Sequence, residues 1–199
     1  MIEFEPFPKI ARLSREVIIS EKIDGTNAQI LIGQWRDFDE EFVINHNLVN
    51  NQVIDGHDFF LVAGSRNRYL TLDNDNYGFA KWCNNNWEEL IKLGPGRHFG
   101  EWWGQGIQRG YGLKEKRFSL FNTTRWSDDN IRPACCHVVP TIYRGIWYTG
   151  CERDAMDAVL YSSIAAPGYT NPEGIVLYHT HANVLFKKTF EKDATGKDA

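Results

Sequence analysis

Residues 16–35 constrain the fold most, because two apolar, β-branched runs flank a short polar turn. "EVIIS" precedes the turn and "AQILIGQW" follows it, and both have the composition of β-strands. The turn between them reads "KIDG", and Asp-Gly is a strong turn signal. The sequence therefore predicts a β-hairpin with Lys22 at its turn.

Most of the remaining chain also divides into short apolar segments between turn signals. Strands are predicted at residues 59–70 with a turn at Gly64, and at residues 97–108, 116–126, 173–180 and 182–190. Two segments with helical spacing, residues 77–94 and 151–168, close on glycine and proline. Three segments lack such patterns: residues 1–15, expected to lie over the body; 36–58, expected to form a loop or irregular β insert; and 191–199, expected to fray.

These elements predict an α+β fold with mostly antiparallel sheets and a few helices, in one domain over residues 1–199. The chain has 22 Lys and Arg against 26 Asp and Glu, a formal net charge of -4, which argues against a surface coated in basic charge but allows a local basic groove. None of the four cysteines forms a C-x-x-C pair, so reduced thiols are expected rather than a zinc site. The chain shows no signal peptide or membrane-length apolar run, and a cytoplasmic location is expected.

Lys22 is a candidate nucleophile. A lysine on a turn is most often a solvated charge, but here a carboxylate, Asp24, follows closely and apolar strands lie on both sides. Lys187 and Lys188, in the strand segment "LFKKTF", add two cations that could lie beside it. A lysine amine that has lost its proton in such a setting can attack an electrophile.

Two carboxylates, Glu101 and Glu173, each begin or interrupt an apolar segment that is expected to be buried. A buried acid needs a partner. Salt bridges to Arg66 or Lys187 would satisfy them without any function. The functional alternative is that they hold a ribose hydroxyl and a divalent cation near phosphates.

Six short segments occur in the order of the covalent nucleotidyltransferase motifs: "EKIDGTN", "SRN", "FGEWWG", "RFSLFN", "EGIVLY" and "LFKKTF". The chain resembles that superfamily of polynucleotide ligases and mRNA-capping enzymes from about Glu21 to Phe190. "EKIDGTN" and "FGEWWGQGIQRGYG" are most similar to the ATP-dependent RNA ligases of the RNA ligase 2 group. The resemblance implies a nucleotidyltransferase core, in which two mostly antiparallel sheets with flanking helices surround a nucleotide cleft.

The resemblance also implies a role for each matching residue. Lys22 would take AMP as a covalent lysyl phosphoramide. Arg66 would lie near the ribose and the acceptor phosphate, Glu101 would accept from a ribose hydroxyl, and Phe121 would stack on adenine. Glu173 would organise a metal ion, with Asp24 as a second metal candidate, and Lys187 would contact the α-phosphate. Further nucleotide-binding positions are expected at Glu21, Ile23, Asn27 and Lys188.

Two positions depart from the usual family pattern. The last motif often reads K-x-K, whereas this chain reads Lys187-Lys188-Thr189, so either Lys188 or Thr189 could fill its second basic position. The RNA ligase 2 group often has His where Asp24 stands, while Asp is commoner in the wider superfamily. This difference keeps an ATP-dependent DNA ligase open as an alternative to an RNA ligase.

The resemblance implies an enzyme: an RNA ligase that uses ATP and Mg²⁺ or Mn²⁺, transfers AMP to a 5′-phosphate end and joins that end to a 3′-hydroxyl. The alternatives are a DNA ligase, a capping-type guanylyltransferase and a nucleotide-binding module without turnover. Expected partners are ATP and nucleic acid ends or nicks, with RNA favoured, and no membrane. No OB-fold or helical domain is expected within these residues, so a separate subunit or domain could supply the grip on nucleic acid.

Overall fold

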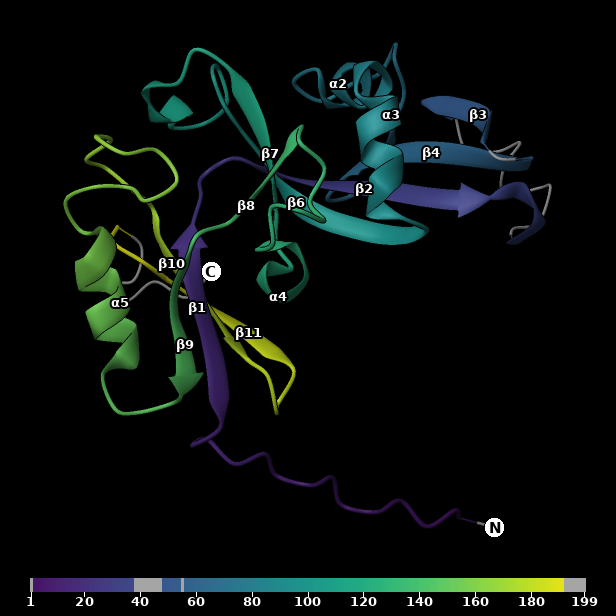
Figure 1. The fold of residues 1–199 in the computed structure, drawn as a ribbon. Helices are drawn as coiled ribbons and strands as arrows, with labels where there is room; N and C mark the ends of the chain where they lie inside the picture. The colour runs from purple at the N-terminus through teal and green to yellow at the C-terminus, as the bar shows by residue number, and fades with distance from the viewer. Residues whose placement is uncertain (1, 38–47, 55, 192–199) are drawn as a thin grey trace.

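Two β-sheets carry the fold, and the segment after Lys22 passes from one to the other (Figure 1). The computed structural model describes residues 2–37, 48–54 and 56–191. The four-stranded sheet has the order β11 (Val184–Thr189), β10 (Gly174–His179), β1 (Glu16–Lys22) and β9 (Thr141–Ile146). All its neighbouring strands are antiparallel.

The seven-stranded sheet contains β2 and the strands that follow it. Its order is β3 (Asn50–Ile54), β4 (His57–Ser65), β2 (Thr26–Gln34), β6 (Gly96–Gly104), β7 (Lys116–Leu120) and β8 (Cys136–Val138), and the short β5 (Tyr69–Leu70) pairs with β4. Its strands are antiparallel except for β7 and β8, which are parallel. The prediction of mostly antiparallel sheets is therefore confirmed.

The predicted hairpin around Lys22 is wrong. β1 is bonded on both edges, to β10 and β9, so it has no free edge for β2. β2 instead pairs with β4 and β6. Gly25 permits this crossing, because a Cβ there would lie 2.5 Å from the Trp102 carbonyl oxygen of β6. The Asp-Gly turn thus connects two sheets rather than two neighbouring strands.

The helices are shorter than predicted. The segment 77–94 divides into α2 (Phe79–Asn85), α3 (Trp87–Leu90) and a 3-10 turn, η2 (Ile91–Leu93), because Asn86 leaves helical geometry and its side chain bonds the Trp82 carbonyl at 2.8 Å. α5 (Cys151–Val159) also stops well before Pro167.

The strand predicted over 116–126 ends at Leu120. Asn122 then caps a one-turn helix, α4 (Thr123–Trp126), by accepting from the Arg125 amide at 3.1 Å. Two further 3-10 turns are η1 (Trp35–Asp37) and η3 (Gly110–Gly112).

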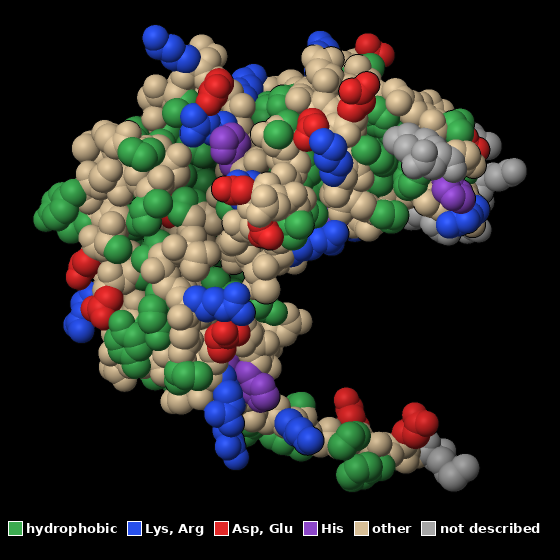
Figure 2. All heavy atoms as spheres, viewed as in Figure 1, with side chains coloured by type: hydrophobic (Ala, Val, Ile, Leu, Met, Phe, Trp, Pro, Cys, Tyr) green, Lys and Arg blue, Asp and Glu red, His purple; other side chains and the backbone are tan. Residues whose placement is uncertain are grey.

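Residues 2–13 do not lie over the body as expected. They contain no helix or strand, and they extend as an arm away from the sheets up to Leu13, whose carbonyl contacts His179 Nε2 of β10 at 2.9 Å (Figures 1 and 2). The insert expected over 36–58 contains β3, and its residues 38–47 and 55 lie outside the described part, as do residues 192–199 of the tail.

Each sheet has its own hydrophobic core. One face of the seven-stranded sheet packs on α2 and α3, with Phe79, Trp102 and Phe118 at the centre. One face of the four-stranded sheet packs on α5 through Val17, Ile19 and neighbouring residues.

On the other face of the seven-stranded sheet, Leu31, Phe60 and Val62 form a small separate cluster. Nearer to Lys22, that face carries the polar residues Asn27 and Glu101, which are hydrogen-bonded to each other.

Among the described residues, no helix is long and apolar enough to cross a membrane. The four cysteines form no disulfide, and three of them are buried, as expected of reduced thiols.

Gly174 of β10 lies so close to β11 that it leaves no room for a side chain. It has a φ of +150°, and a Cβ at this position would lie 2.1 Å from the Lys188 carbonyl oxygen. We expect Gly174→Ala to lower the free energy of unfolding by more than about 1 kcal/mol, because it adds a backbone clash to the strain of positive φ. Denaturant unfolding measures this change.

Gly106→Ala is the matched control, because Gly106 also has a positive φ, of +73°, but no atom lies within 4 Å of a Cβ there. It should destabilise the protein less than Gly174→Ala. Equal losses in the two variants would show that the contact with β11 does not constrain Gly174.

Candidate active site

Lys22 lies at the end of β1 and contacts Glu173. Its Nζ donates to Glu173 Oε2 at 2.6 Å, and the two side chains are 24% and 15% exposed. The strand register produces this contact, because Lys22 pairs with Gly174 and Glu173 is the residue just before it. The amine is therefore held in a fixed place while a partly open side leaves room for a ligand.

Glu101 is buried beside this pair. Its Oε1 accepts from the Gly25 amide at 3.1 Å and its Oε2 from Asn27 Nδ2 at 3.0 Å. Burial raises the pKa of Glu101 to about 7, although the two donors and the positive charge of Lys22 oppose this change. A carboxyl that titrates near neutrality, within a polar cluster next to a lysine, is typical of functional sites.

Asp24 is engaged by the loop that follows β6. Arg109 Nε donates to Asp24 Oδ2 at 3.0 Å, and the Asp24 amide donates to the Tyr111 hydroxyl at 2.8 Å. Arg109 also contacts Glu191 at 2.8 Å. The structure thus gives Asp24 a role in holding the turn after Lys22, and it brings Glu173, rather than Asp24, into direct contact with Lys22.

Glu21 and Ile23 point away from Lys22. Glu21 is buried on the opposite face of β1, where it accepts from the Ser163 hydroxyl and from the amides of Ile164 at 2.9 Å and Ala165 at 2.8 Å. Ile23 is buried with Trp103 and other apolar residues. Their side chains anchor the two strands on either side of Lys22.

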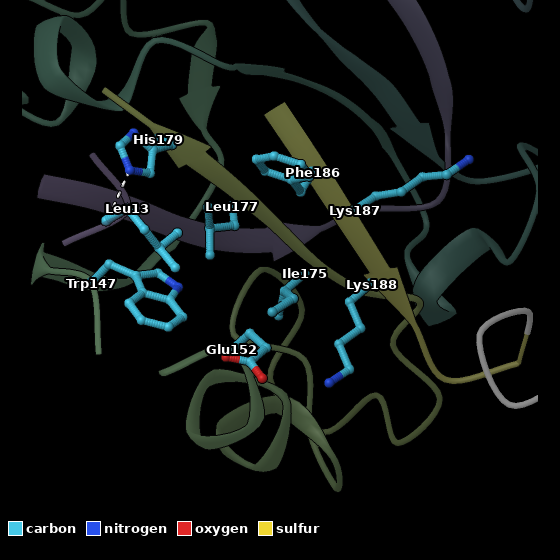
Figure 3. A pocket seen from close by; sticks show the side chains of 9 residues that line it. All are labelled: Leu13, Trp147, Glu152, Ile175, Leu177, His179, Phe186, Lys187 and Lys188. Atoms are coloured by element: carbon cyan, nitrogen blue, oxygen red, sulfur yellow. Dashed lines mark hydrogen bonds between the residues drawn. The ribbon is translucent and has the colours of Figure 1, made fainter. Parts of the chain in front are cut away.

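Strand alternation separates the two lysines of β11. Lys187 pairs with Val176, which pairs with Ser20, so Lys187 shares the face of Lys22. Lys188 pairs with Ile175 on the opposite face, toward α5. Figure 3 shows the two side chains pointing in opposite directions, with Lys188 directed toward Glu152 in a cavity of about 500 Å³.

Thr189 is the other candidate for the second position of the last motif. It pairs with Gly174, which pairs with Lys22, so Thr189 lies in the same row as the candidate nucleophile. It is also buried. The structure therefore brings Lys187 and Thr189 to the face of Lys22 and leaves Lys188 on the other.

Phe121 and Arg66 lie at the border of the site. Phe121 follows β7 and is 42% exposed. Arg66 is exposed in the turn after β4. Ser65 pairs with Ala28 and Arg66 is the next residue, so the Arg66 backbone lies at the level of Asn27, which pairs with Glu101. Both side chains could meet a ligand that rests on Glu101.

Arg109 and Tyr111 are the supporting residues that sequence reasoning missed. Tyr111 has a φ of 52°, and its neighbours Gly110 and Gly112 also have positive φ angles. Its ring packs at 5.0 Å from the Trp103 ring. The only signal in the sequence was the glycine-rich run "GQGIQRGYG", which indicates a turn but not the residues it will contact.

Residues 15–192 match a family model described as RNA ligase. No curated protein sequence matches the chain. Among solved structures, the chain is similar to an RNA ligase from Naegleria gruberi. An arginine-to-alanine variant of that ligase with ATP and Mn aligns with 92% of this chain and 52% of that chain, with a TM-score of 0.58 and 17% identity.

Two other structures of the Naegleria gruberi RNA ligase give similar values. A lysine-to-alanine variant with ATP and Mn covers 88% of this chain and 49% of that chain, with a TM-score of 0.56 and 18% identity. A lysine-to-methionine variant with AMP and Mn covers 93% and 52%, with a TM-score of 0.57 and 17% identity. The chain spans about half the length of these relatives. The predicted α+β, two-sheet nucleotidyltransferase fold is confirmed.

Glu101 should make the stability of the protein depend on pH. Its pKa is raised in the folded state, from 4.5 to about 7, so the folded protein binds more protons between these values than the unfolded chain. The free energy of unfolding therefore falls through this window as pH rises. At about 1.4 kcal/mol per pKa unit, the contribution of Glu101 to this fall approaches about 3 kcal/mol.

Glu101→Gln removes the titrating group and isolates this effect. The free energy of unfolding of the variant minus that of wild type should increase from pH 5 to pH 8. A destabilisation by the amide that does not depend on pH would shift this difference by a constant and leave its slope unchanged. Denaturant unfolding at several pH values measures the difference. A difference that stays flat across this range would show that Glu101 does not titrate near 7.

Proposed function

Because the chain belongs to the RNA ligase family, we propose that it joins RNA ends with ATP, using Lys22 as the nucleophile. The contact that carries this proposal is the 2.6 Å ion pair between Lys22 and Glu173, formed where the two sheets meet. Around it, the structure gathers Glu101, Asn27 and the Lys187 face of β11. This set can hold a nucleotide by its ribose and its phosphates.

In the first step, Lys22 Nζ would attack the α-phosphorus of ATP. The attacking amine must be neutral, so one ammonium proton first passes to Glu173 across the 2.6 Å contact. A P–N bond then forms, the bond from the α-phosphorus to the bridging oxygen breaks, pyrophosphate leaves with the electron pair of that bond, and the nitrogen gives a second proton to solvent. Glu173 would orient Nζ through the bond seen here. Lys187, on the same face, would offset the charge that develops on the phosphoryl oxygens.

In the second step, an oxygen of an RNA 5′-phosphate would attack the same phosphorus, and the P–N bond would break to release Lys22. In the third step, a 3′-hydroxyl would attack the activated 5′-phosphate and displace AMP. Arg66 at the border of the site would contact the acceptor phosphate, and Glu101 would accept from the ribose. These two assignments follow the resemblance to the family motifs; the one for Glu101 is also supported by its location beside Lys22.

A divalent cation such as Mg²⁺ or Mn²⁺ would neutralise phosphate charge in this reaction. Such ions commonly keep several waters and bind one or two carboxylates together with substrate phosphates. Glu173 fits that role, whereas Asp24 is occupied by Arg109. Among the described residues, no group of three or more His, Cys, Asp and Glu side chains is arranged to hold a metal ion.

Two further points belong to this proposal. A cytoplasmic location would suit the reduced cysteines. A separate subunit or domain that binds nucleic acid would suit the net charge of -4, because 26 acidic against 22 basic residues give the chain no overall attraction for a polyanion.

Covalent labelling tests the nucleophile directly. Wild-type protein incubated with ATP and Mg²⁺ should gain the mass of one AMP, and Lys22→Ala should gain none. GTP in place of ATP should give no covalent adduct; a GMP adduct would favour the capping-type guanylyltransferase. Absence of the adduct in wild type, or its persistence in Lys22→Ala, would refute the proposal.

The two lysines of β11 provide a matched pair of variants. Lys187→Ala should slow formation of the AMP adduct more strongly than Lys188→Ala, because only Lys187 shares the face of Lys22. Single-turnover kinetics with ATP measure both. A larger loss in Lys188→Ala would place the phosphates on the α5 side of the sheet and overturn this geometry.

Phe121 should contribute stacking on adenine. We expect Phe121→Ala to weaken ATP binding by about 1–3 kcal/mol, as for other base–aromatic contacts, and Phe121→Tyr to be nearly silent. Titration with ATP in a Lys22→Ala background measures this effect. If Phe121→Ala lowers the melting temperature without changing ATP affinity, Phe121 is a packing residue.

Sealing assays separate the ligase alternatives. Nicked duplexes with RNA or DNA at the joined ends should show faster sealing of RNA. Faster sealing of DNA would favour the DNA ligase, and adduct formation without sealing of either would favour a nucleotide-binding module.

A further inference from the structure

On the face of β6 that carries Glu101, the next side chains away from Lys22 are exposed. The neighbouring strands at the level of Arg97 carry the buried Leu31 and Val62 on this face. Strand alternation along β6 places Trp102 in the core and Glu101, Phe99 and Arg97 on the opposite face. Phe99 is 52% exposed, and Phe121 is 42% exposed. Two large aromatic rings are thus open to solvent next to the proposed nucleotide site.

The strand register aligns these two rings. Gly100 pairs with Leu120, so Phe99 lies across from Phe121, and the Phe121 amide donates to the Phe99 carbonyl at 3.0 Å. Gln29 pairs with Phe99 on the other side. This row lies two residues beyond Glu101 along β6, a distance of about 7 Å for an extended strand.

Arg97 extends the same face by another two residues. Its guanidinium donates to Gln29 Oε1 at 3.0 Å and to the Tyr69 hydroxyl at 2.9 Å. It also lies over the Tyr69 ring, 5.9 Å from the centroid. These contacts hold the cation in place while its charge remains at the exposed surface.

The helices lie on the other side of the sheet from this row. The core around Trp102 packs against α2 and α3, whereas Glu101, Phe99 and Arg97 project from the opposite face. A strand of nucleic acid could lie along this row without meeting α2 or α3.

We propose that Phe99 and Arg97 form an RNA subsite next to the nucleotide pocket, where Phe99 stacks on a nucleobase and Arg97 contacts a phosphate. The inference rests on the proposed function, since it names the part of the RNA end that the same site would hold. Proteins that bind single strands combine aromatic platforms with cations along a groove. Glu101, Phe99 and Arg97 follow one another along one face of β6, at increasing distance from Lys22. The aromatic ring and the cation of that combination are therefore both present on this face.

A single exposed Phe is common on protein surfaces and needs no explanation. Here the second ring at the same level and the ordered arginine beyond it distinguish this surface from a scattered exposed residue. Glu101 lies in the same line, so the subsite is continuous with the proposed nucleotide site.

The test measures RNA affinity and adduct formation separately. The probe is a single-stranded RNA oligonucleotide whose 5′ end already carries AMP, so that binding does not require reaction with ATP. Phe99→Ala and Phe99→Leu should weaken its binding roughly 5- to 150-fold, the range expected for one base–aromatic stack, and Phe99→Tyr should retain it. Tyr161→Ala, an exposed aromatic residue elsewhere, is the control and should bind like wild type.

Arg97→Ala tests the phosphate contact independently. Loss of one contact should reduce the slope of log affinity against log salt concentration by roughly 0.7–0.9, whereas Phe99→Ala should leave the slope unchanged. Thermal unfolding of each variant shows whether it is folded, and the comparison of Phe99→Leu with Phe99→Tyr stays informative if Phe99→Ala is unstable.

Failure of this inference and failure of the proposed function give different results. If wild type forms the AMP adduct but Phe99→Ala or Phe99→Leu binds the probe as wild type does, the stacking subsite is wrong and the ligase proposal stands. If wild type forms no adduct with ATP, the proposed function fails whatever the Phe99 variants do.

Discussion

The antiparallel register of β1 and β10 is the constraint on which the site depends. It places Lys22 opposite Gly174, and Glu173 consequently reaches the amine at 2.6 Å. The same register, continued to β11, places Lys187 on the Lys22 face. Gly174 makes this close pairing possible, since a side chain there would collide with the Lys188 carbonyl. One row of backbone hydrogen bonds therefore positions the proposed nucleophile and two of the groups around it.

Glu101 is the second constraint, because its hydrogen bonds connect the seven-stranded sheet to the turn that follows Lys22. Its carboxylate comes from the seven-stranded sheet and accepts from Gly25, in the turn that leaves Lys22, and from Asn27. Arg109 and Tyr111 hold the same turn from another side. Burying an acid in this position costs stability, because its pKa rises to about 7. The proposed binding of ribose and phosphates close to a lysine amine would account for an acid in this position.

Local patterns explain which predictions were correct. The strands at β6, β10 and β11 were predicted because their alternation and composition are local properties. The hairpin was wrong because pairing is a tertiary property: the turn alone cannot show that both edges of β1 are used by distant strands. The first predicted helix was longer than the observed one, because the Asn86 side chain bonds the Trp82 carbonyl and α2 ends there. Apolar spacing in the sequence does not show such a bond.

The sequence by itself determined the chemical groups and their order: Lys22, Glu101, Glu173 and Lys187 in segments that resemble one family of motifs. It also determined that Lys187 and Thr189 would share a face, because side chains of a strand alternate with a period of two. The tertiary structure alone decided which face that was, that Asp24 would pair with Arg109, and that Phe99 would lie beside Phe121. These are contacts between residues far apart in the chain, and only the register of paired strands and the closing of the two sheets set their distances.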